Sequence, residues 1–374
     1  MGRLHTEEMI LNMGPQHPST HGVLRLKLIT DGEIVSHVEP VIGYLHRSFE
    51  KHAENLEYQM VSPFVDRADY IAAMNNGHAY AIAVEKMLGI ELPPRVEYIR
   101  VIMAEFQRIA SHLIAVGTFG LDVGGITPFI YCMRERELIL DLFEMASGAR
   151  LLYNYIWIGG LAHDLPAGWV EKAYEFLDEF DFHVEEYNRI LTTNKIFIER
   201  TADVGVLPVE VAINYGVTGP NLRGSGIPFD VRKNQPYSFY DRFEWKVPVG
   251  EGAMGSVGDS WDRYMVRIEE MLESAKIIRQ ALDQLPAEGD VKAAIPKKIR
   301  PPKGAEIYSR YENPRGELGF YIRSDGTNIP TRVKMRSPAF SNISALNEIS
   351  QGWMMSDVIT ILGSLDIVLG EIDR

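Results

Sequence analysis

The spacing of apolar residues changes twice along the chain. Within the first forty-five residues apolar and polar positions alternate, in MILNM and in VLRLKLITDGEIVSHVEPVIG, and Asp31-Gly32 is typical of a hairpin turn. From there to about residue 285 apolar residues recur mainly at helical spacing. The last ninety residues return to strand-like alternation around Asp325-Gly326 and close with a short helix, 357–367. We therefore expect an α+β chain, a bundle of long helices flanked by small N-terminal and C-terminal β-sheets.

Proline, glycine and small polar residues mark where the long helices should begin and end. Pro94 suits the first residue of a helix, Thr127-Pro128 an N-cap and first residue, and Asp259 or Ser260 the cap of the last long helix. The expected helices are 67–89, 94–116, 128–155, 169–191 and 260–285. The chain then divides into an N-terminal β domain (1–66), a helical core (67–290) and a C-terminal hairpin region with a terminal helix (291–374).

Composition narrows the classes of protein. The net charge of −13 argues against a nucleic-acid-binding surface, which is normally basic. A single cysteine, Cys132, excludes a disulfide framework, a CxxC redox pair and a zinc site built on two cysteines. The first thirty residues do not resemble a signal peptide. The most apolar window, 113–133, is interrupted by Asp122, Gly124-Gly125 and Pro128, so we expect a helix end, a loop and a new helix rather than a membrane span.

A glycine pattern at 250–255, GEGAMG, fits the dinucleotide-binding spacing GxGxxG and follows a plausible strand, 243–249. A dinucleotide site requires these glycines to lead directly into a helix within a βαβ unit. Here the helix begins only after Gly258, and no buried parallel strand is expected beyond it. We interpret the pattern as a glycine-rich surface loop and expect no NAD binding by this chain.

The segment NMGPQHPSTHG, residues 12–22, holds two histidines on a loop whose prolines and glycines forbid a helix. His17 and His21 lack a compact set of further metal ligands, and a structural hydrogen-bonding role is the simpler interpretation. Asp122 is the only charged residue within 113–133. A buried carboxylate needs a partner and raises the pKa of a neighbouring histidine. His21, Asp122 and a tyrosine could form a proton-donating group; alternatively, Asp122 only caps a helix.

Two other patterns have plain structural interpretations. The charged run Arg134-Glu135-Arg136-Glu137 is expected on a solvated or interface face. Methionine and aromatic residues at helical spacing are expected in the core, and the length of the helices favours large packed surfaces and a protein partner.

Nine segments, in order and reaching from about residue 7 to the last residue, resemble the 49-kDa subunit family (the D subunit) of respiratory complex I, NADH:quinone oxidoreductase. They are NMGPQHPSTHGVLRL, VIGYLHRSFEK, DRADY, RVEYIRVIMAEFQRIASHL, LDVGGITPFIYCMRERELILDLFE, NYIWIGG, DVRKNQPYS, MVRIEEMLESAKIIRQAL and GSLDIVLGEIDR. This family is related to the large subunit of nickel–iron hydrogenases, and the resemblance implies that bundle. One cysteine cannot reproduce the four thiolates of the hydrogenase centre, and the segment beginning at Asp366 stands where a cysteine pair would begin.

The resemblance also implies roles for individual residues. His21 and Tyr70 match the residues that hydrogen-bond the two carbonyl oxygens of a quinone and supply its protons, and Asp122 matches the partner of that histidine. His17 lies on the same loop as a supporting residue. Arg47 and Arg67 match arginines facing the terminal tetranuclear iron–sulfur cluster, which the neighbouring small B subunit carries. The substrate would be menaquinone or ubiquinone, reduced by electrons from that cluster and coupled to proton translocation, with no metal held by this chain.

One departure from the family concerns the cluster. Many members have a histidine two residues before the NY of NYxxIGG, where this chain has Leu152. Removing a titrating cation should lower the cluster potential and weaken its pH dependence, which would suit menaquinone.

Partners and location follow from the same resemblance. The B, C and I subunits and the membrane-embedded H subunit are implied, in a complex of about fourteen subunits on the cytoplasmic face of the bacterial inner membrane, with this chain peripheral. Two alternatives stay open: a related membrane complex driven by ferredoxin or another reduced cofactor, and a scaffold that keeps the fold without the chemistry. Retention of His21, Tyr70 and Asp122 argues against the scaffold.

Overall fold

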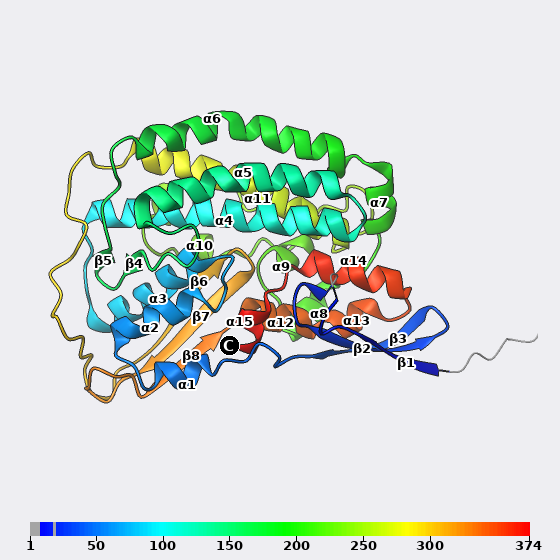
Figure 1. The fold of residues 1–374 in the computed structure, drawn as a ribbon, viewed down its shortest axis with the longest axis horizontal. Coiled ribbons are helices and arrows are strands. Elements are labelled where there is room, and N and C mark those ends of the chain that lie inside the picture. Colours follow the sequence, from blue (N-terminus) through cyan, green and yellow to red (C-terminus); the bar gives the residue numbers. More distant parts are fainter. Residues whose placement is uncertain (1–7, 18–19) are drawn as a thin grey trace, which may run out of the picture.

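The computed structural model describes residues 8–17 and 20–374 and confirms a mixed chain with a helical core and small antiparallel sheets. Four long helices lie side by side, and two three-stranded sheets lie on the side of the molecule opposite α6 (Figure 1). The long helices are α4 (Pro94–Asp122), α5 (Ile126–Ser147), α6 (Trp169–Tyr187) and α11 (Ser260–Asp283).

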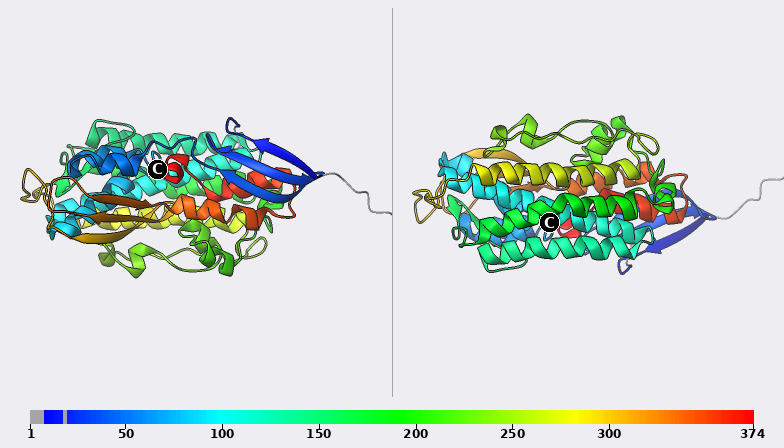
Figure 2. Two further views of the ribbon diagram at one scale, coloured as in Figure 1. Left: turned by 90° about the horizontal axis from the view of Figure 1, so that it is seen from below. Right: turned by 90° about the horizontal axis from the view of Figure 1, so that it is seen from above.

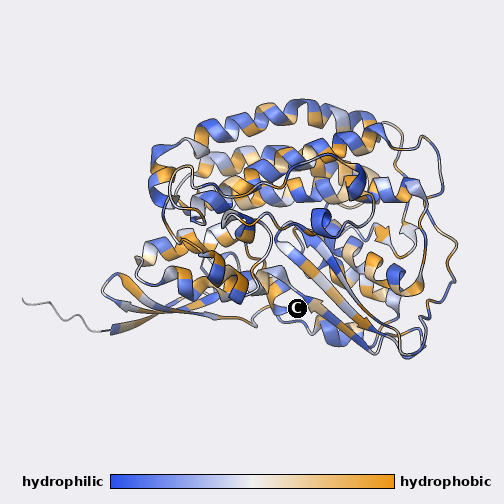
Figure 3. Cartoon of the chain, turned by 180° about the vertical axis from the view of Figure 1, so that it is seen from behind, coloured by the Kyte–Doolittle hydropathy of each residue, from blue (hydrophilic) through white to orange (hydrophobic). Residues whose placement is uncertain are grey.

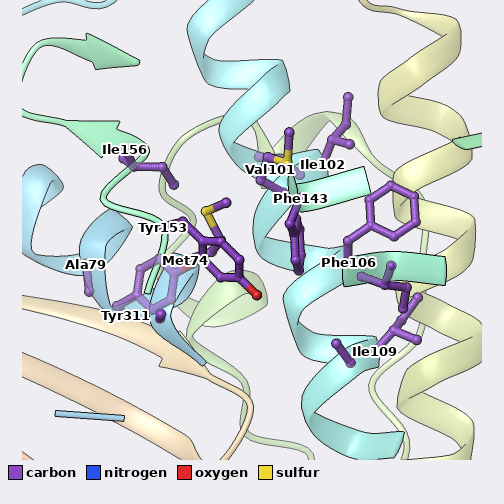
Figure 4. Close-up of a cluster of buried hydrophobic side chains, with 14 of the residues drawn as sticks. Met74, Ala79, Val101, Ile102, Phe106, Ile109, Phe143, Tyr153, Ile156 and Tyr311 are labelled. Atoms are coloured by element: carbon purple, nitrogen blue, oxygen red, sulfur yellow. The ribbon is translucent and has the colours of Figure 1, made fainter. Parts of the chain in front are cut away.

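Helix α4 is the centre of the bundle. It packs against both α5 and α11, and nearly all of its residues are buried. A Cβ atom on Gly117 would lie 3.2 Å from Cα of Phe129, so the glycine permits the close approach of α4 and α5. Figure 4 shows Val101, Ile102 and Phe106 of α4 pointing into the apolar core beside Phe143 of α5. The outer face of α6 is largely hydrophilic, as expected for the solvent side of a bundle (Figure 3).

The N-terminal sheet is built as the alternation predicts. Strands β1 (Glu8–Met13), β2 (Arg25–Asp31) and β3 (Ile34–Val41) pair antiparallel, and the β2–β3 turn contains Gly32 at φ 64°. Leucines of β2 and valines of β3 point to one face and pack in a second apolar core formed mainly with C-terminal helices. The predicted hairpin is therefore confirmed.

The C-terminal region carries a second antiparallel sheet, β6 (Glu306–Asn313), β7 (Gly316–Arg323) and β8 (Arg332–Arg336). Its tight hairpin turn lies between Asn313 and Gly316, whereas Asp325-Gly326 lies in the loop between β7 and β8. The chain then ends in buried short helices, one of which matches the expected helix 357–367. These are α12 (Pro338–Ser344), α13 (Leu346–Ser350), α14 (Met355–Leu365) and α15 (Leu369–Asp373).

The remaining elements are short, apart from α3, and much of the chain between α7 and α11 forms an irregular layer along one side of the bundle (Figure 2). They are α1 (Phe49–Ala53), α2 (Tyr58–Asp66), α3 (Ala73–Leu88), β4 (Ile156–Trp157), β5 (Gly160–Leu161), the π-helix η2 (Asn188–Thr192), α7 (Lys195–Thr201), α8 (Val209–Asn214), α9 (Pro220–Gly224), α10 (Val231–Asn234) and the 3-10 helix η3 (Tyr240–Arg242).

Several predicted boundaries are wrong, each for a local reason. Helix α3 begins at Ala73 rather than 67, because Asp69 accepts hydrogen bonds from the backbone N–H groups of residues 71 and 72 and holds a turn. Helix α5 begins two residues before Pro128, and it stops at Ser147 because Gly148 adopts φ 80°. The expected strand 243–249 is not a strand but irregular chain.

Only two of the four residues in the charged run 134–137 lie on the exposed face where all four were expected. Arg134 and Glu137 are exposed, but Glu135 and Arg136 are buried. The Glu135 carboxylate accepts a hydrogen bond from the hydroxyl of Tyr187 and pairs with Arg134. The buried charge of Glu135 is thus neutralised by neighbouring groups. The alternating charges in the sequence do not reveal that this residue is buried.

The window 113–133 is divided as predicted, since α4 ends at Asp122 and α5 starts at Ile126. Within the described ranges, no helix has the length and apolar character needed to cross a bilayer. The division into three domains stays a prediction.

Candidate functional site

The loop between β1 and β2 presents His21. An isolated bridge pairs residues 17 and 22, and the buried Thr20 hydroxyl donates a hydrogen bond to the carbonyl of His17 at 2.8 Å. His21 itself has φ 52°, a left-handed conformation that is uncommon for residues other than glycine. Pro18 and Ser19 lie outside the described residues.

The imidazole of His21 reaches the end of α4. Its Nε2 atom lies 2.6 Å from Oδ2 of Asp122, and both side chains are largely shielded from solvent, at 15% and 9% exposure. Asp122 is the last residue of the helix, where free backbone groups are carbonyls that a carboxylate cannot cap. The helix-cap interpretation is therefore wrong, and a protonated histidine also compensates the negative end of the helix dipole.

The charge of this pair follows from its surroundings. Burial lowers the pKa of His21, but the hydrogen bond and charge of Asp122, together with the charge of Asp366, outweigh burial and raise that pKa above its ordinary value of 6.5. The charge of Arg315 acts in the opposite direction. The pair therefore favours an imidazolium, which has a proton to give.

Helix α14 holds the Asp122 carboxylate from behind. A Cβ atom added to Gly363 would lie only 2.6 Å from Asp122 Oδ2, so the carboxylate occupies space that any larger side chain would take. On the other side, a Cβ on Gly22 would contact Cδ1 of Leu369 at 3.4 Å. The C-terminal segment thus packs against both the helix end and the histidine loop.

Tyr70 lies on the turn before α3 and is 39% exposed, so a small molecule can reach its side chain. The ring packs on the C-terminal segment, because a Cβ on Gly370 would lie 3.4 Å from Cε1 of Tyr70. Burial of the ring and then the charge of Asp69 raise the pKa of Tyr70 above 10, against the charges of Arg315 and Arg47. Tyr70 is accordingly a neutral phenol and a hydrogen-bond donor.

A buried ion-pair triad that the sequence did not predict acts electrostatically on both His21 and Tyr70. Nη1 of Arg315 lies 2.8 Å from Oδ2 of Asp69, and Nη2 lies 3.2 Å from Oδ1 of Asp366. The positive charge of Arg315 lowers the pKa of both His21 and Tyr70, so it acts on both candidate proton donors. The sequence gives only a weak signal for this triad, because each of its residues stands alone in a turn or at a helix end.

The structure also brings Arg47 and Arg67 together. Nη2 of Arg47 donates a hydrogen bond to the carbonyl of Arg67 at 2.6 Å, and both side chains are exposed. The charge of Arg47 also acts on Tyr70. His17, on the loop of His21, is exposed at the surface.

One other sequence candidate, the glycine pattern, has a structural role. In the glycine loop 250–255, the N–H of Gly252 donates to Asp262, and a Cβ on Gly250 would overlap the carbonyl oxygen of Gly224 at 1.9 Å. The segment is a loop with exposed residues at 251, 253 and 254, as predicted, and the close packing of its backbone at Gly250 is an additional role of the glycines. Within the described part of the chain, no group of three or more His, Cys, Asp or Glu side chains is arranged to hold a metal ion.

Comparison with known proteins identifies the family. Residues 122–374 match the family model described as the respiratory-chain NADH dehydrogenase 49 Kd subunit. The NADH-quinone oxidoreductase D subunit of Chlorobium luteolum is 56% identical over 374 residues, which cover 99% of this chain and 94% of that protein. A D subunit of the same enzyme from Cytophaga hutchinsonii is 56% identical over 383 residues, covering 100% and 97%. The chain therefore belongs to the 49-kDa subunit family of the respiratory-chain NADH dehydrogenase, and is one component of an oxidoreductase complex.

Proposed function

We propose that this chain forms, with the iron–sulfur B subunit, the site at which a proton-translocating NADH–quinone oxidoreductase reduces quinone. The observation that carries the proposal is the His21–Asp122 pair, whose atoms lie 2.6 Å apart, together with the exposed Tyr70; the charge of Arg315 acts on both His21 and Tyr70. The relatives are NADH-quinone oxidoreductase subunits, which supports quinone as the substrate class.

Quinone reduction needs two electrons and two protons, one for each oxygen. As electrons arrive, both oxygens become more basic and require a proton donor within hydrogen-bond distance. The imidazolium of His21 and the phenol of Tyr70 are two such donors, with environments that differ in charge. Each donates a hydrogen bond to one carbonyl oxygen and then transfers its proton, leaving a neutral imidazole and a tyrosinate.

Proton transfer from His21 changes the charge balance behind it. The Asp122 carboxylate loses its cationic partner in a site that is only 9% exposed. An unpaired charge in such a site costs several kcal/mol. We propose that this imbalance begins the coupling between quinone reduction and proton translocation in the membrane part of the complex.

The electrons come from a group that this chain does not hold. Its single cysteine cannot supply the thiolates of an iron–sulfur cluster. The exposed, adjacent Arg47 and Arg67 suit a surface that meets the terminal cluster of the B subunit, because their positive charge stabilises the reduced cluster.

Leu152 belongs to the same part of the molecule as these arginines. Two residues after it, the backbone N–H of Asn154 donates a hydrogen bond to Asp66, the neighbour of Arg67, at 2.7 Å. The Leu152 side chain packs against the bundle core and leaves no titrating group at its position. This suits a cluster of low potential and a low-potential quinone such as menaquinone.

The remaining partners are proposed from family membership. We infer contacts with the B, C and I subunits and with the membrane-embedded H subunit, and a position on the cytoplasmic face of the bacterial membrane. The charge of −13 is compatible with a protein surface and unsuited to nucleic acid.

A photoreactive quinone tests the site directly. Membranes containing the complex are illuminated with an azido-quinone, and labelled peptides are mapped by mass spectrometry. Labelling of the loop around His21 or of the turn around Tyr70, prevented by excess unmodified quinone, supports the proposal. Competed labelling confined to other regions of the chain or to other proteins of the complex would refute it.

A further inference from the structure

Glu371 is a buried carboxylate that the proposed reaction does not use. Its side chain lies in α15 with 0% exposure, and neither carboxylate oxygen has a hydrogen-bond partner among the described residues. An ionised carboxylate in such a place would lose its hydration without compensation. Burial, and next the negative charge of Asp69, accordingly raise the pKa of Glu371 well above its ordinary value.

The balance of charges around Glu371 also favours its protonated form. Arg315 pairs with two buried carboxylates, Asp69 and Asp366, and its charge also acts on the third, Glu371; Asp366 has a second cation, Arg267, at 3.9 Å. Three acids facing two arginines leave one negative charge without a partner, and a buried group in this position binds a proton instead. Because Asp69 and Asp366 both pair with Arg315, the acid without a partner is Glu371.

Two more distant cations do not change this count. Arg336 donates hydrogen bonds to backbone carbonyls, among them that of Gly216 at 2.8 Å, and Arg374 lies 3.4 Å from Glu50. Both lower the pKa of Glu371, but less than burial and Asp69 raise it.

The proton of Glu371 is held close in sequence to a residue that contacts Tyr70. The preceding residue, Gly370, forms the surface on which the Tyr70 ring packs. Asp69 and Arg315 influence the protonation of both Tyr70 and Glu371. Glu371 is therefore a buried acid next in sequence to the residue that contacts the Tyr70 ring.

We propose that Glu371 holds the proton that restores Tyr70 after Tyr70 has protonated a quinone oxygen; the inference rests on the proposed function. In the first step the O–H bond of Tyr70 breaks and a bond forms between that proton and the reduced oxygen. In the second, the proton of Glu371 passes to the tyrosinate, and the charge of Arg315 stabilises the new carboxylate. Glu371 then regains a proton from solvent, so no further reactant is needed.

The direction of the second step follows from acid strength. A carboxylic acid is ordinarily a stronger acid than a phenol. Burial of the ring and the charge of Asp69 raise the pKa of Tyr70, which makes its tyrosinate a stronger base and favours its return to the phenol. Glu371 does not contact the quinone, and its role is to keep Tyr70 in the proton-donating state.

The test uses membranes containing the assembled complex with Glu371→Gln, which resembles the neutral acid in shape. We expect normal quinol formation in the first turnover after a pulse of NADH, because Tyr70 is already protonated. Steady-state kcat should fall about tenfold at unchanged KM. The loss should grow as pH rises, since solvent must then supply the proton.

Matched variants separate this role from a structural one. Glu97→Gln removes another acid with a buried, unpartnered oxygen, in the first turn of α4, and should leave the pH profile unchanged. Glu371→Asp keeps an acid and should retain intermediate activity with a shifted profile. If Glu371→Gln does not assemble, a wild-type profile in Glu371→Asp overturns the proposal, and a shifted one supports it.

Two results would overturn the inference: a wild-type kcat and pH profile in Glu371→Gln, or an equal loss in the first and later turnovers. Tyr70→Phe is measured in parallel. Normal turnover in Tyr70→Phe refutes the proposed function itself, whereas a loss there with normal Glu371→Gln refutes only the role of Glu371.

Discussion

His21 and Asp122 lie about a hundred residues apart in sequence, yet Nε2 of the histidine is 2.6 Å from Oδ2 of the aspartate. A constrained loop supplies one partner and the last residue of the central helix the other. Neither group is fully exposed, so the proton between them is held in a partly dehydrated place where its loss has a large energetic effect.

Replacing Asp122 with asparagine should remove the charge that raises the pKa of His21. Burial then dominates, the pKa of His21 falls, and less imidazolium is present at neutral pH. We expect inhibitor-sensitive quinone reduction to fall by about 10²-fold and the remaining activity to increase toward acidic pH. Asp181→Asn, on the exposed face of α6, is the control. An unchanged pH profile in Asp122→Asn would contradict the assigned pairing.

The same pair predicts how the stability of the loop depends on pH. Because the folded-state pKa of His21 is raised, the contribution of the pair is fully present below pH 6.5 and is lost as pH rises through the raised value. A hydrogen bond between charged groups contributes about 1.5–3 kcal/mol. Hydrogen exchange of the peptide containing His21, corrected for intrinsic rates, should therefore increase with pH. Asp122→Asn should abolish this increase, and its persistence there would assign it to another group.

Gly363→Ala tests whether α14 holds the Asp122 carboxylate in place. The added methyl group would lie 2.6 Å from Oδ2, so the carboxylate must shift from the position in which it contacts His21. We expect a destabilisation of about 1–3 kcal/mol and a partial loss of quinone reduction. Gly120→Ala is the matched control, since its methyl group first meets the flexible side chain of Leu191, at 3.2 Å. Thermal unfolding and activity are compared in the assembled complex, and equal effects of the two variants would contradict the account.

Arg315→Met should strongly destabilise the region under the site. It leaves Asp69 without its 2.8 Å partner and Asp366 without its 3.2 Å partner, in a place with little or no solvent. Removing one member of a buried ion pair costs roughly 3–5 kcal/mol. We expect reduced assembly and a lower unfolding temperature, measured by native electrophoresis and thermal denaturation. Arg310→Met, on the exposed side of β6, should have little effect.

Local pattern predicted most of the fold. Apolar spacing with Pro94, Asp31-Gly32 and Asp259 as boundary residues indicated the bundle, the N-terminal hairpin and the start of α11, because these features act within a few residues. The prediction failed where a side chain overrode propensity. Asp69 delays the start of α3, and this depends on a distant partner, Arg315, that holds the aspartate.

The candidate site was predicted only in part. The isolated charge of Asp122 in an apolar window pointed to a partner, and the resemblance to the family selected His21 and Tyr70. The triad centred on Arg315 could not be found in this way, because its members come from a turn, a hairpin and a helix end. A usable signal does exist in the sequence: Arg100, Glu105 and Arg108 on the apolar α4 imply that ionisable groups pair inside this bundle.

The most direct measurement is quinone reduction in membranes carrying Tyr70→Phe or His21→Ala, with assembly and reduction of the iron–sulfur clusters by NADH checked in the same samples. The account predicts that cluster reduction persists while inhibitor-sensitive turnover falls tenfold or more, a barrier increase of at least about 1.4 kcal/mol. Near-normal turnover in fully assembled complexes would contradict it and would assign the quinone chemistry to other residues.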